Sequence, residues 1–459
     1  MLDFFTSFTP TVKYYDTFRR NLKLQLPAMK ISILTICLLF VFSSSKQIEH
    51  QSFNDFCTNF IKIYRSLNIP EFQLSYAENF QHIKPEYELQ RQTEFFQQIR
   101  NTLSDYEKDS LTTEQGDILD LINYETELNL QRLALEKQWI RVRPGVIPTN
   151  NFHAIPNDSA WYIYYLQKWL GAKVHPDELY LNGLEEIERV QQHIKDIQQQ
   201  TGMDSAQFYQ YLNDSSFFIT NEIQVHQAFE ETKNMVLKNI GNLFAVTQIS
   251  DVSIKRGTST PLIHAPGYYS NNTFYYNLFD APYNKRQVGW LFIHEAIPGH
   301  HYEAFVTDHS PTSEVQQLFH YPAFNEGWAA YTEELGKELG VYKTPYDELG
   351  KWEWDLVRSV RVPLDVGLNY YGWNNEKALA FWKKYIPNRD DIALREINRM
   401  RTWPAQVITY KYGASQIIKW KKLMQLQKGT AFDIKAFHST ILQNGSLPFF
   451  LMQRKIFRA

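Results

Sequence analysis

Residues 290–305, WLFIHEAIPGHHYEAF, set a dense group of polar side chains inside an otherwise apolar stretch. His294, Glu295, His300 and His301 lie within eight positions. Moving imidazole and carboxylate groups into an apolar interior costs several kcal/mol unless they are paired or bound to a metal. The alternative is a cluster that is exposed or hydrogen-bonded internally. The fold must therefore supply partners to this segment, which constrains the structure more than any other part of the chain.

A break in the helix is expected within this segment. In the common zinc motif HExxH, two histidines one helical turn apart face the same ion, and the glutamate between them acts as a base. Here the position four residues after His294 is Pro298. Proline in a helix interior removes a hydrogen bond and clashes with the preceding turn, and Gly299 adds backbone freedom. We therefore predict that the helix breaks at these two residues and resumes at His300.

The length of the break decides which histidine is the second ligand. If two residues loop out, His300 takes the usual position, whereas His301 would require three. In an unbroken helix His294 and His301 would lie roughly 10 Å apart along the axis, too far to share one zinc ion bound at about 2 Å. We predict that His294 and His300 bind the metal and that Glu295 is the catalytic base. His301 would face the cleft and contact substrate, or pack against a neighbour.

Residues 325–334, NEGWAAYTEE, supply a third ligand. A catalytic zinc site normally has three protein ligands and an open position for water. Glu326 opens a predicted helix, and Gly327 and Ala330 would let that helix approach the first one closely. Acidic residues on helices are usually only solvated, but the upstream cluster makes Glu326 the predicted metal ligand. Glu333, about two turns later, is predicted to hydrogen-bond a ligating histidine.

These residues carry a resemblance to a known family. HExxPGHH at 294–301 followed by EGW at 326–328 resembles the bacterial family called domain of unknown function 885, a set of gluzincin-like metallohydrolases. Further segments that resemble it are 176–189, 358–373 and 399–413. The resemblance implies a large helical, zincin-like fold. Asn369 stands where the family pattern usually has histidine, and Met400 where an aromatic residue is common.

Composition indicates a globular protein without a nucleic-acid partner. Of the 459 residues, 44% are hydrophobic and 15% aromatic, which supports a large buried core rather than disorder. The formal net charge is −3 and no strongly basic block occurs, so the electrostatic pattern of a nucleic-acid-binding protein is missing. We predict a single helical domain at 46–459, built either as one unit or as two closely packed subdomains around a cleft.

Residues 29–47, MKISILTICLLFVFSSSKQ, are typical of a secretory signal peptide. A lysine precedes an apolar run at 31–42, and small residues follow. This run is too short for an ordinary membrane span, and a buried helix is the alternative. We predict that 1–45 is an N-terminal extension plus signal peptide, with translation starting at Met29. The mature protein would be secreted or periplasmic, without a stable membrane span.

The spacing of apolar residues predicts a mainly α-helical chain. The predicted helical segments are 53–106, 112–139, 158–170, 176–200 and 347–384. The period changes at 252–255 and 273–278, which predicts short strands forming a small β-sheet beside the metal helix. We interpret 274–277 as an edge strand that binds an extended peptide by strand addition, with Tyr275 and Asn277 as substrate-binding residues. A small structural hairpin is the alternative.

Three later residues are candidates for contacts with substrate. Arg358 and Arg361 share a segment with Asp365, so an internal Arg–Asp pair is the default interpretation. The functional alternative is an arginine that binds a substrate carboxylate through two hydrogen bonds. Tyr410 lies in the C-terminal segment that resembles the family, and it is the candidate donor to the oxyanion of a tetrahedral intermediate. A merely packed tyrosine is the alternative.

These residues predict a secreted, zinc-dependent hydrolase of amide bonds, with peptides as the best-fitting substrates. Zinc would activate a bound water, and Glu295 would take its proton. One alternative is a metal-dependent hydrolase of a non-peptide acyl substrate, and another is a metal-containing binding protein without turnover. The intact Glu295 argues against the second, because a structural zinc site needs no base and fills its fourth position with protein. The oligomeric state is left open.

Overall fold

The structure, a computed structural model, describes residues 52–142, 145–278, 282–387 and 389–458. It is 69% helical with only small sheets, which confirms the predicted mainly α fold. The predicted signal peptide lies outside the described residues. Among the helices that are described, none is long and apolar enough to cross a membrane.

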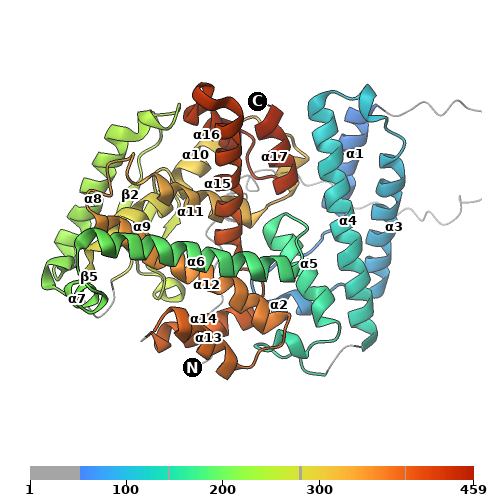
Figure 1. Cartoon of the computed structure of the whole chain (residues 1–459). Helices are drawn as coiled ribbons and strands as arrows, with labels where there is room; N and C mark the ends of the chain where they lie inside the picture. Colours follow the sequence, from blue (N-terminus) through green and yellow to red (C-terminus); the bar gives the residue numbers. More distant parts are fainter. Residues whose placement is uncertain (1–51, 143–144, 279–281, 388, 459) are drawn as a thin grey trace, which may run out of the picture.

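Three long N-terminal helices stand side by side along one side of the molecule (Figure 1). They are α1 (Phe53–Ser66), α3 (Glu86–Leu103) and α4 (Thr113–Val142). The start of α4 is fixed by a capping box: Thr112 Oγ1 accepts from the Gln115 backbone N–H at 3.2 Å, and Gln115 Oε1 accepts from the Thr112 N–H at 3.0 Å. These bonds satisfy backbone donors that the first turn of a helix leaves unpaired.

The rest of the described chain is also mostly helical. Its helices are α2 (Tyr76–Gln81), α5 (Asp158–Leu170), α6 (Pro176–Thr201), α7 (Ser205–Tyr211), α8 (Glu222–Asn239), α9 (Val288–Glu295), α10 (His300–Asp308), α11 (Pro322–Thr332), α12 (Pro345–Asn369), α13 (Asn375–Tyr385), α14 (Asp390–Thr402), α15 (Ile408–Lys428), α16 (Ile434–Gln443) and α17 (Phe449–Arg458). Helices α5 and α6 match their predicted bounds within a residue. The segment predicted as helical at 347–384 consists of two helices, α12 and α13.

Two packed helix pairs hold the central region together. Helix α6 lies along α12, as Figure 1 shows, and α11 lies along α15. Most buried apolar side chains, from α1 to α17, form one cluster, so the N-terminal helices and the central helices share a core. A smaller second cluster joins α7 to α6 and α12. Helices α9, α10 and α11 pack into the shared core, so that His294 is buried and Glu295, His300 and Glu326 are half-buried.

The sheet beside α9 corrects one prediction. Its strands are β2 (Ser253–Arg256), β3 (Gly267–Ser270) and β4 (Thr273–Tyr276), in the order β2-β4-β3, with β2 parallel and β3 antiparallel to β4. Strand β4, predicted as an edge strand, is the central one, so both of its edges are already hydrogen-bonded. The outer strand β3 was not predicted. Strands β1 (Phe218–Ile219) and β5 (Tyr283–Asn284) form a separate antiparallel pair.

Candidate metal site and active-site cavity

The metal-site helix breaks where the sequence predicts. Helix α9 ends at Glu295 and α10 begins at His300. A side chain at Gly299 would overlap the carbonyl oxygens of Ile293 and His294, so only glycine allows the chain to fold back this closely. The backbone N–H of His301 donates to the Ala296 carbonyl at 3.1 Å, which restarts hydrogen bonding after the break. His294 and His300 are thus separated by two residues more than the two histidines of HExxH.

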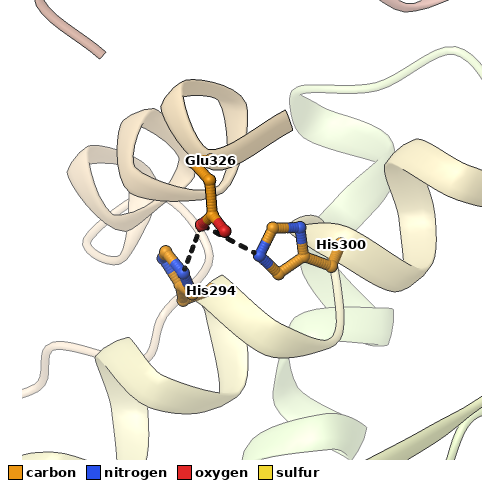
Figure 2. A group of neighbouring side chains, drawn as sticks. All are labelled: His294, His300 and Glu326. Carbon is orange, nitrogen blue, oxygen red and sulfur yellow. Dashed lines mark ion pairs between the residues drawn. The ribbon is translucent and has the colours of Figure 1, made fainter. Parts of the chain in front are cut away.

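Three side chains from three helices meet at this break (Figure 2). Glu326 Oε2 lies 3.9 Å from His294 Nε2 and 3.5 Å from His300 Nε2. Ligand atoms bound tetrahedrally at zinc, with bonds of about 2.0–2.1 Å, lie roughly 3.4 Å apart. The two separations from Glu326 are within a few tenths of an ångström of this value, and all three ligand atoms lie within 4.8 Å of one another. These are the three residues that the sequence predicts as ligands, and the structure brings them together.

The electrostatics of the metal-free cluster suit an incoming cation. Burial and the charge of Arg358 hold the pKa of His294 well below its usual range, which keeps this imidazole neutral. Burial also lowers the pKa of His300, but the hydrogen bond and charge of Glu326 outweigh it and raise that pKa to about 9. His300 is therefore protonated at neutral pH and forms an ion pair with the Glu326 carboxylate when no ion is present. Metal ligands must give up such a proton, so a cation would displace it.

Trp328 of the EGW segment stabilises the break between α9 and α10. The Trp328 indole N–H donates to the Pro298 carbonyl at 2.9 Å, which satisfies an acceptor that the break leaves without a helical partner. The prediction that Gly327 lets α11 approach the metal helix is wrong. A side chain at Gly327 would overlap the backbone of Gly413, so this glycine permits the close contact between α11 and α15.

Glu333 occupies the position predicted for it behind the metal site. Its Oε1 accepts from Nδ1 of His294 at 2.8 Å, and NH1 of Arg358 donates to both of its oxygens at 2.6 and 2.8 Å. NH2 of Arg358 also lies 3.3 Å from this Nδ1, but the contact with the Glu333 carboxylate, ionised by its pair with Arg358, is shorter. The histidine proton is therefore assigned to Nδ1, and the Nε2 lone pair faces Glu326. The Arg358–Glu333 pair thus fixes both the tautomer and the ring orientation of His294.

Glu295 lines the cavity beside the cluster without a structural task. No hydrogen bond or ion pair engages its carboxylate in the part of the chain that the structure describes. Burial raises the pKa of Glu295 to about 7 in the metal-free chain. A carboxylate that lies beside the ligand cluster and is not tied to the fold is available for proton transfer.

Tyr410 faces the same cluster from the first turn of α15. Its ring centroid lies 6.4 Å from that of His294, and the guanidinium carbon of Arg358 lies 5.8 Å from the Tyr410 ring. Burial and the charge of Glu326 raise the pKa of Tyr410 above its ordinary value. The phenol therefore stays protonated and keeps a hydrogen that it can donate.

Three residues predicted to contact substrate are held by other contacts and lie outside the cavity lining. His301 is 1% exposed, with Nε2 2.8 Å from the Ser250 carbonyl and Nδ1 3.0 Å from the Tyr269 hydroxyl, so it packs against neighbours. The Tyr275 ring stacks on Tyr268 in the sheet. The amide of Asn277 donates to the carbonyls of two loop residues, Leu262 and Ala265. Within the described residues, the cavity lining includes none of the three.

The predicted internal Arg–Asp pair does not form. Arg358 binds Glu333, and Arg361 donates two hydrogen bonds to Glu396 on α14, at 2.9 and 2.8 Å. Asp365 instead accepts from the Tyr162 hydroxyl at 2.7 Å and from a backbone N–H. For Arg361, the two parallel hydrogen bonds to Glu396 give a stronger contact than Asp365, one turn away, would offer. Both arginines line the cavity, so a role in substrate binding stays a prediction.

The two departures from the family pattern lie together outside the cavity lining. The Asn369 amide donates to the Met400 carbonyl at 3.0 Å and to Asp365 at 3.3 Å. Asn369 is 1% exposed and Met400 is fully buried. These positions therefore join α12 to α14.

A cavity of about 960 Å³ opens over the cluster. The N-terminal region, including α4 and α5, forms one side, while β3, α9 to α12, α14 and the start of α15 form the other. It contains Glu295, all three candidate ligands and Tyr410. The 5% exposure of the His294 side chain, against 18% for His300 and 24% for Glu326, places the accessible edge of the cluster at the last two.

Sequence reasoning missed two parts of this cavity. Strand β3 contributes Gly267, Tyr268 and Tyr269, and α14 contributes Arg395 and Arg399. The change of period near residue 270 and the RMRTWP segment were the available signals. Neither indicates which side chains face the metal site, because this depends on how helices and strands pack.

Comparisons with known proteins agree with this fold. A family model described as "Bacterial protein of unknown function (DUF885)" matches residues 134–456. A crystal structure from Colwellia psychrerythraea, titled a "putative lipoprotein", matches with a TM-score of 0.61 and 21% identity over 89% of this chain and 74% of that chain. A "putative lipoprotein of unknown function" from Shewanella oneidensis matches with a TM-score of 0.54 and 20% identity over 87% of this chain and 76% of that chain. None of the curated proteins matches.

Proposed function

This chain belongs to DUF885, a family of bacterial proteins of unknown function, and we propose that it is a zinc-dependent hydrolase of amide bonds that acts on peptides. The observation that carries the proposal is the meeting of His294, His300 and Glu326 at the wall of a large cavity that also holds Glu295. Two imidazoles and one carboxylate are a donor set of catalytic zinc sites. Structural sites usually fill all four positions with protein, whereas this set leaves one open.

The ligand separations of 3.5 and 3.9 Å fit one zinc ion. Zinc bound here would lower the pKa of a water molecule and polarise the substrate carbonyl. Glu333 and Arg358 hold the His294 ring in the orientation that turns Nε2 toward Glu326. Because these supports are buried and bonded to one another, the site is preorganised before substrate enters.

The chain's own residues supply the proton transfers. Glu295 takes a proton from the attacking water and delivers it to the amide nitrogen, so that a hydroxyl joins the carbonyl carbon as the C–N bond breaks. Tyr410 donates a hydrogen bond to the oxygen that becomes negatively charged. Strand β3 is an outer strand of its sheet and lines the cavity. An extended peptide can pair with such an edge through backbone hydrogen bonds.

The two alternatives make different demands on the site. A non-peptide acyl substrate would use the same metal and base, but it would not need the sheet edge at the cavity. A binding protein without turnover would have no need for Glu295, whose carboxylate lies in the cavity without a structural partner among the described residues. Peptide hydrolysis uses the ligand cluster, the base and the strand together.

The purified protein is expected to contain about one zinc per chain and to cut peptides only while the metal is bound. Metal analysis gives the stoichiometry, and mass spectrometry of a peptide library gives the products. A chelator should abolish cleavage, and added zinc should restore it. Protein produced with zinc available that carries no bound ion would refute the proposal. A zinc-loaded protein that cuts acyl esters but no peptide would support the first alternative.

We also propose that the chain is exported. Residues 29–45 have the pattern of a signal peptide, and two solved structures of similar fold carry lipoprotein in their titles. The mature chain is expected to begin near Lys46 and to lie outside the cytoplasm. N-terminal sequencing of native material checks this, and a sequence that reads through the apolar run would reject it.

A further inference from the structure

One wall of the cavity carries an excess of positive charge. Helices α12 and α14 contribute Arg361, Arg395, Glu396 and Arg399 to the lining. Arg361 is paired with Glu396 through two hydrogen bonds, and NH1 of Arg399 lies 4.0 Å from the same carboxylate. The wall thus holds three guanidinium groups and one carboxylate, which leaves a net charge of about +2, because arginine is always protonated.

Among these three arginines, Arg395 acts on Glu396 through its charge alone. Its side chain is half-buried in the cavity lining, and no hydrogen bond or ion pair holds it in the part of the chain that the structure describes. A partly buried charge without a partner is unfavourable. Its guanidinium presents paired N–H donors that match a carboxylate.

The neighbouring arginines are held rigidly. The guanidinium carbon of Arg361 lies 5.5 Å from the ring centroid of Trp354, and that of Arg399 lies 5.6 Å from Trp403. NH2 of Arg399 donates to Gln406 at 2.7 Å. Fixed groups of like charge around Arg395 keep the wall positive without rearrangement, so an anion that enters the cavity meets a preformed field.

This wall adjoins the metal site. Arg399 lies within hydrogen-bonding reach of Tyr410, whose ring lies 6.4 Å from that of His294. Arg395 precedes Arg399 by four residues on α14, so the two side chains share one face about 6 Å apart. An extended peptide advances about 3.4 Å per residue. An anionic group at Arg395 would therefore lie at most a few residues from the bond at the metal.

We propose that the α12–α14 wall binds the free C-terminal carboxylate of a short peptide, with Arg395 as the residue that takes it. Every unblocked peptide carries this anionic group, and no particular side chain is required. The inference rests on the proposed peptide hydrolysis and makes the protein an exopeptidase that cuts near the C-terminus. Water adds across the peptide bond, leaving a carboxylate on the longer fragment and an amine on the short one released.

Lys168 is the competing candidate and the matched control. It lies on α5, lines the cavity and is half-buried, and the described residues offer it no ion pair. It shares the cavity with Arg395 but not the wall of α12 and α14. If any cation in the cavity sufficed for binding, Lys168→Gln and Arg395→Gln would have equal effects.

The proposal is tested by calorimetric titration of zinc-loaded, full-length Glu295→Gln protein. The ligand is N-acetyl-trialanine, used once as the free acid and once as the C-terminal amide. In this background the acid is expected to bind about tenfold or more tightly than the amide, as for a charge-assisted contact. Adding Arg395→Gln should remove this preference and leave amide binding within about twofold, whereas Lys168→Gln should keep the preference. Equal binding of acid and amide, no binding of the acid, or a preference lost only with Lys168→Gln would each overturn the proposal.

A second assay separates this inference from the proposed function. The zinc-loaded native chain is incubated with both forms of a longer alanine peptide, and the products are read by mass spectrometry. Faster release of short C-terminal fragments from the acid supports both proposals. Internal cuts at equal rates in acid and amide retain the hydrolase but overturn the carboxylate subsite. Acid-selective binding without any hydrolysis retains the subsite and rejects the hydrolase.

Discussion

Glu295→Gln is expected to lower peptide turnover by about 100-fold or more while the protein keeps its zinc, because removal of a general base typically costs 10²–10⁴ in rate. Glutamine has nearly the same shape but cannot take a proton. Glu295 is not among the three clustered ligands, and its carboxylate engages no described residue, so neither metal binding nor the fold should suffer. Single-turnover rates and metal content are measured on the same preparation.

Asp308→Asn is the matched control for this variant. Asp308 is an exposed carboxylate at the end of α10 that lines the same cavity, and it is not one of the clustered ligands. Its replacement removes the same charge and should change turnover by no more than a few-fold, as for a screened surface charge. Full activity in Glu295→Gln would exclude this residue as the base. Loss of zinc from it would show that the carboxylate binds metal instead.

His300→Ala is expected to lose most of the bound zinc, whereas His301→Ala should keep it. Removing one of three ligands should weaken binding by more than the roughly 10–100-fold seen when only a supporting residue is removed. His301 instead holds the Ser250 carbonyl and the Tyr269 hydroxyl. Its loss should therefore appear as lower stability, by about 1–3 kcal/mol, with little change in metal affinity.

Competition with a zinc-binding dye, on variants shown to be folded by circular dichroism, gives both affinities. Chemical denaturation after chelation gives the stability difference without the contribution of the metal. The opposite pattern of metal loss would mean that three residues are displaced at the break and that His301 is the ligand. Loss of zinc in both variants with normal folding would also contradict the assigned geometry.

Most of the candidate site could be predicted because its geometry is local. A proline four residues after His294 cannot continue the helix, and a chain that resumes two residues late can only present His300. The third group follows from chemistry, since two imidazoles suited to zinc require another ligand. Helix α5 has its predicted bounds for the same reason, because the regular spacing of apolar residues that indicates a helix lies within one continuous segment.

Predictions failed where the answer depended on which element lies next to which. Arg358 pairs with Glu333, 25 residues away, and Arg361 pairs with Glu396, 35 residues away, although Asp365 is nearer in the chain. Gly327 meets Gly413 of α15 rather than the metal helix. Each choice depends on the rotation and crossing of packed helices. These are set by side-chain packing over the whole core, which no local pattern contains.

The sequence by itself determined the helical class, the break at Pro298–Gly299 and the three residues that gather around it, because these follow from backbone sterics and ligand chemistry within short segments. Tertiary structure decided that β4 lies inside its sheet, which leaves β3 as the edge at the cavity. It also decided that Arg395 stays without a partner among the described residues. Strand order and ion pairing are properties of the packed chain, since they depend on contacts between segments far apart in sequence.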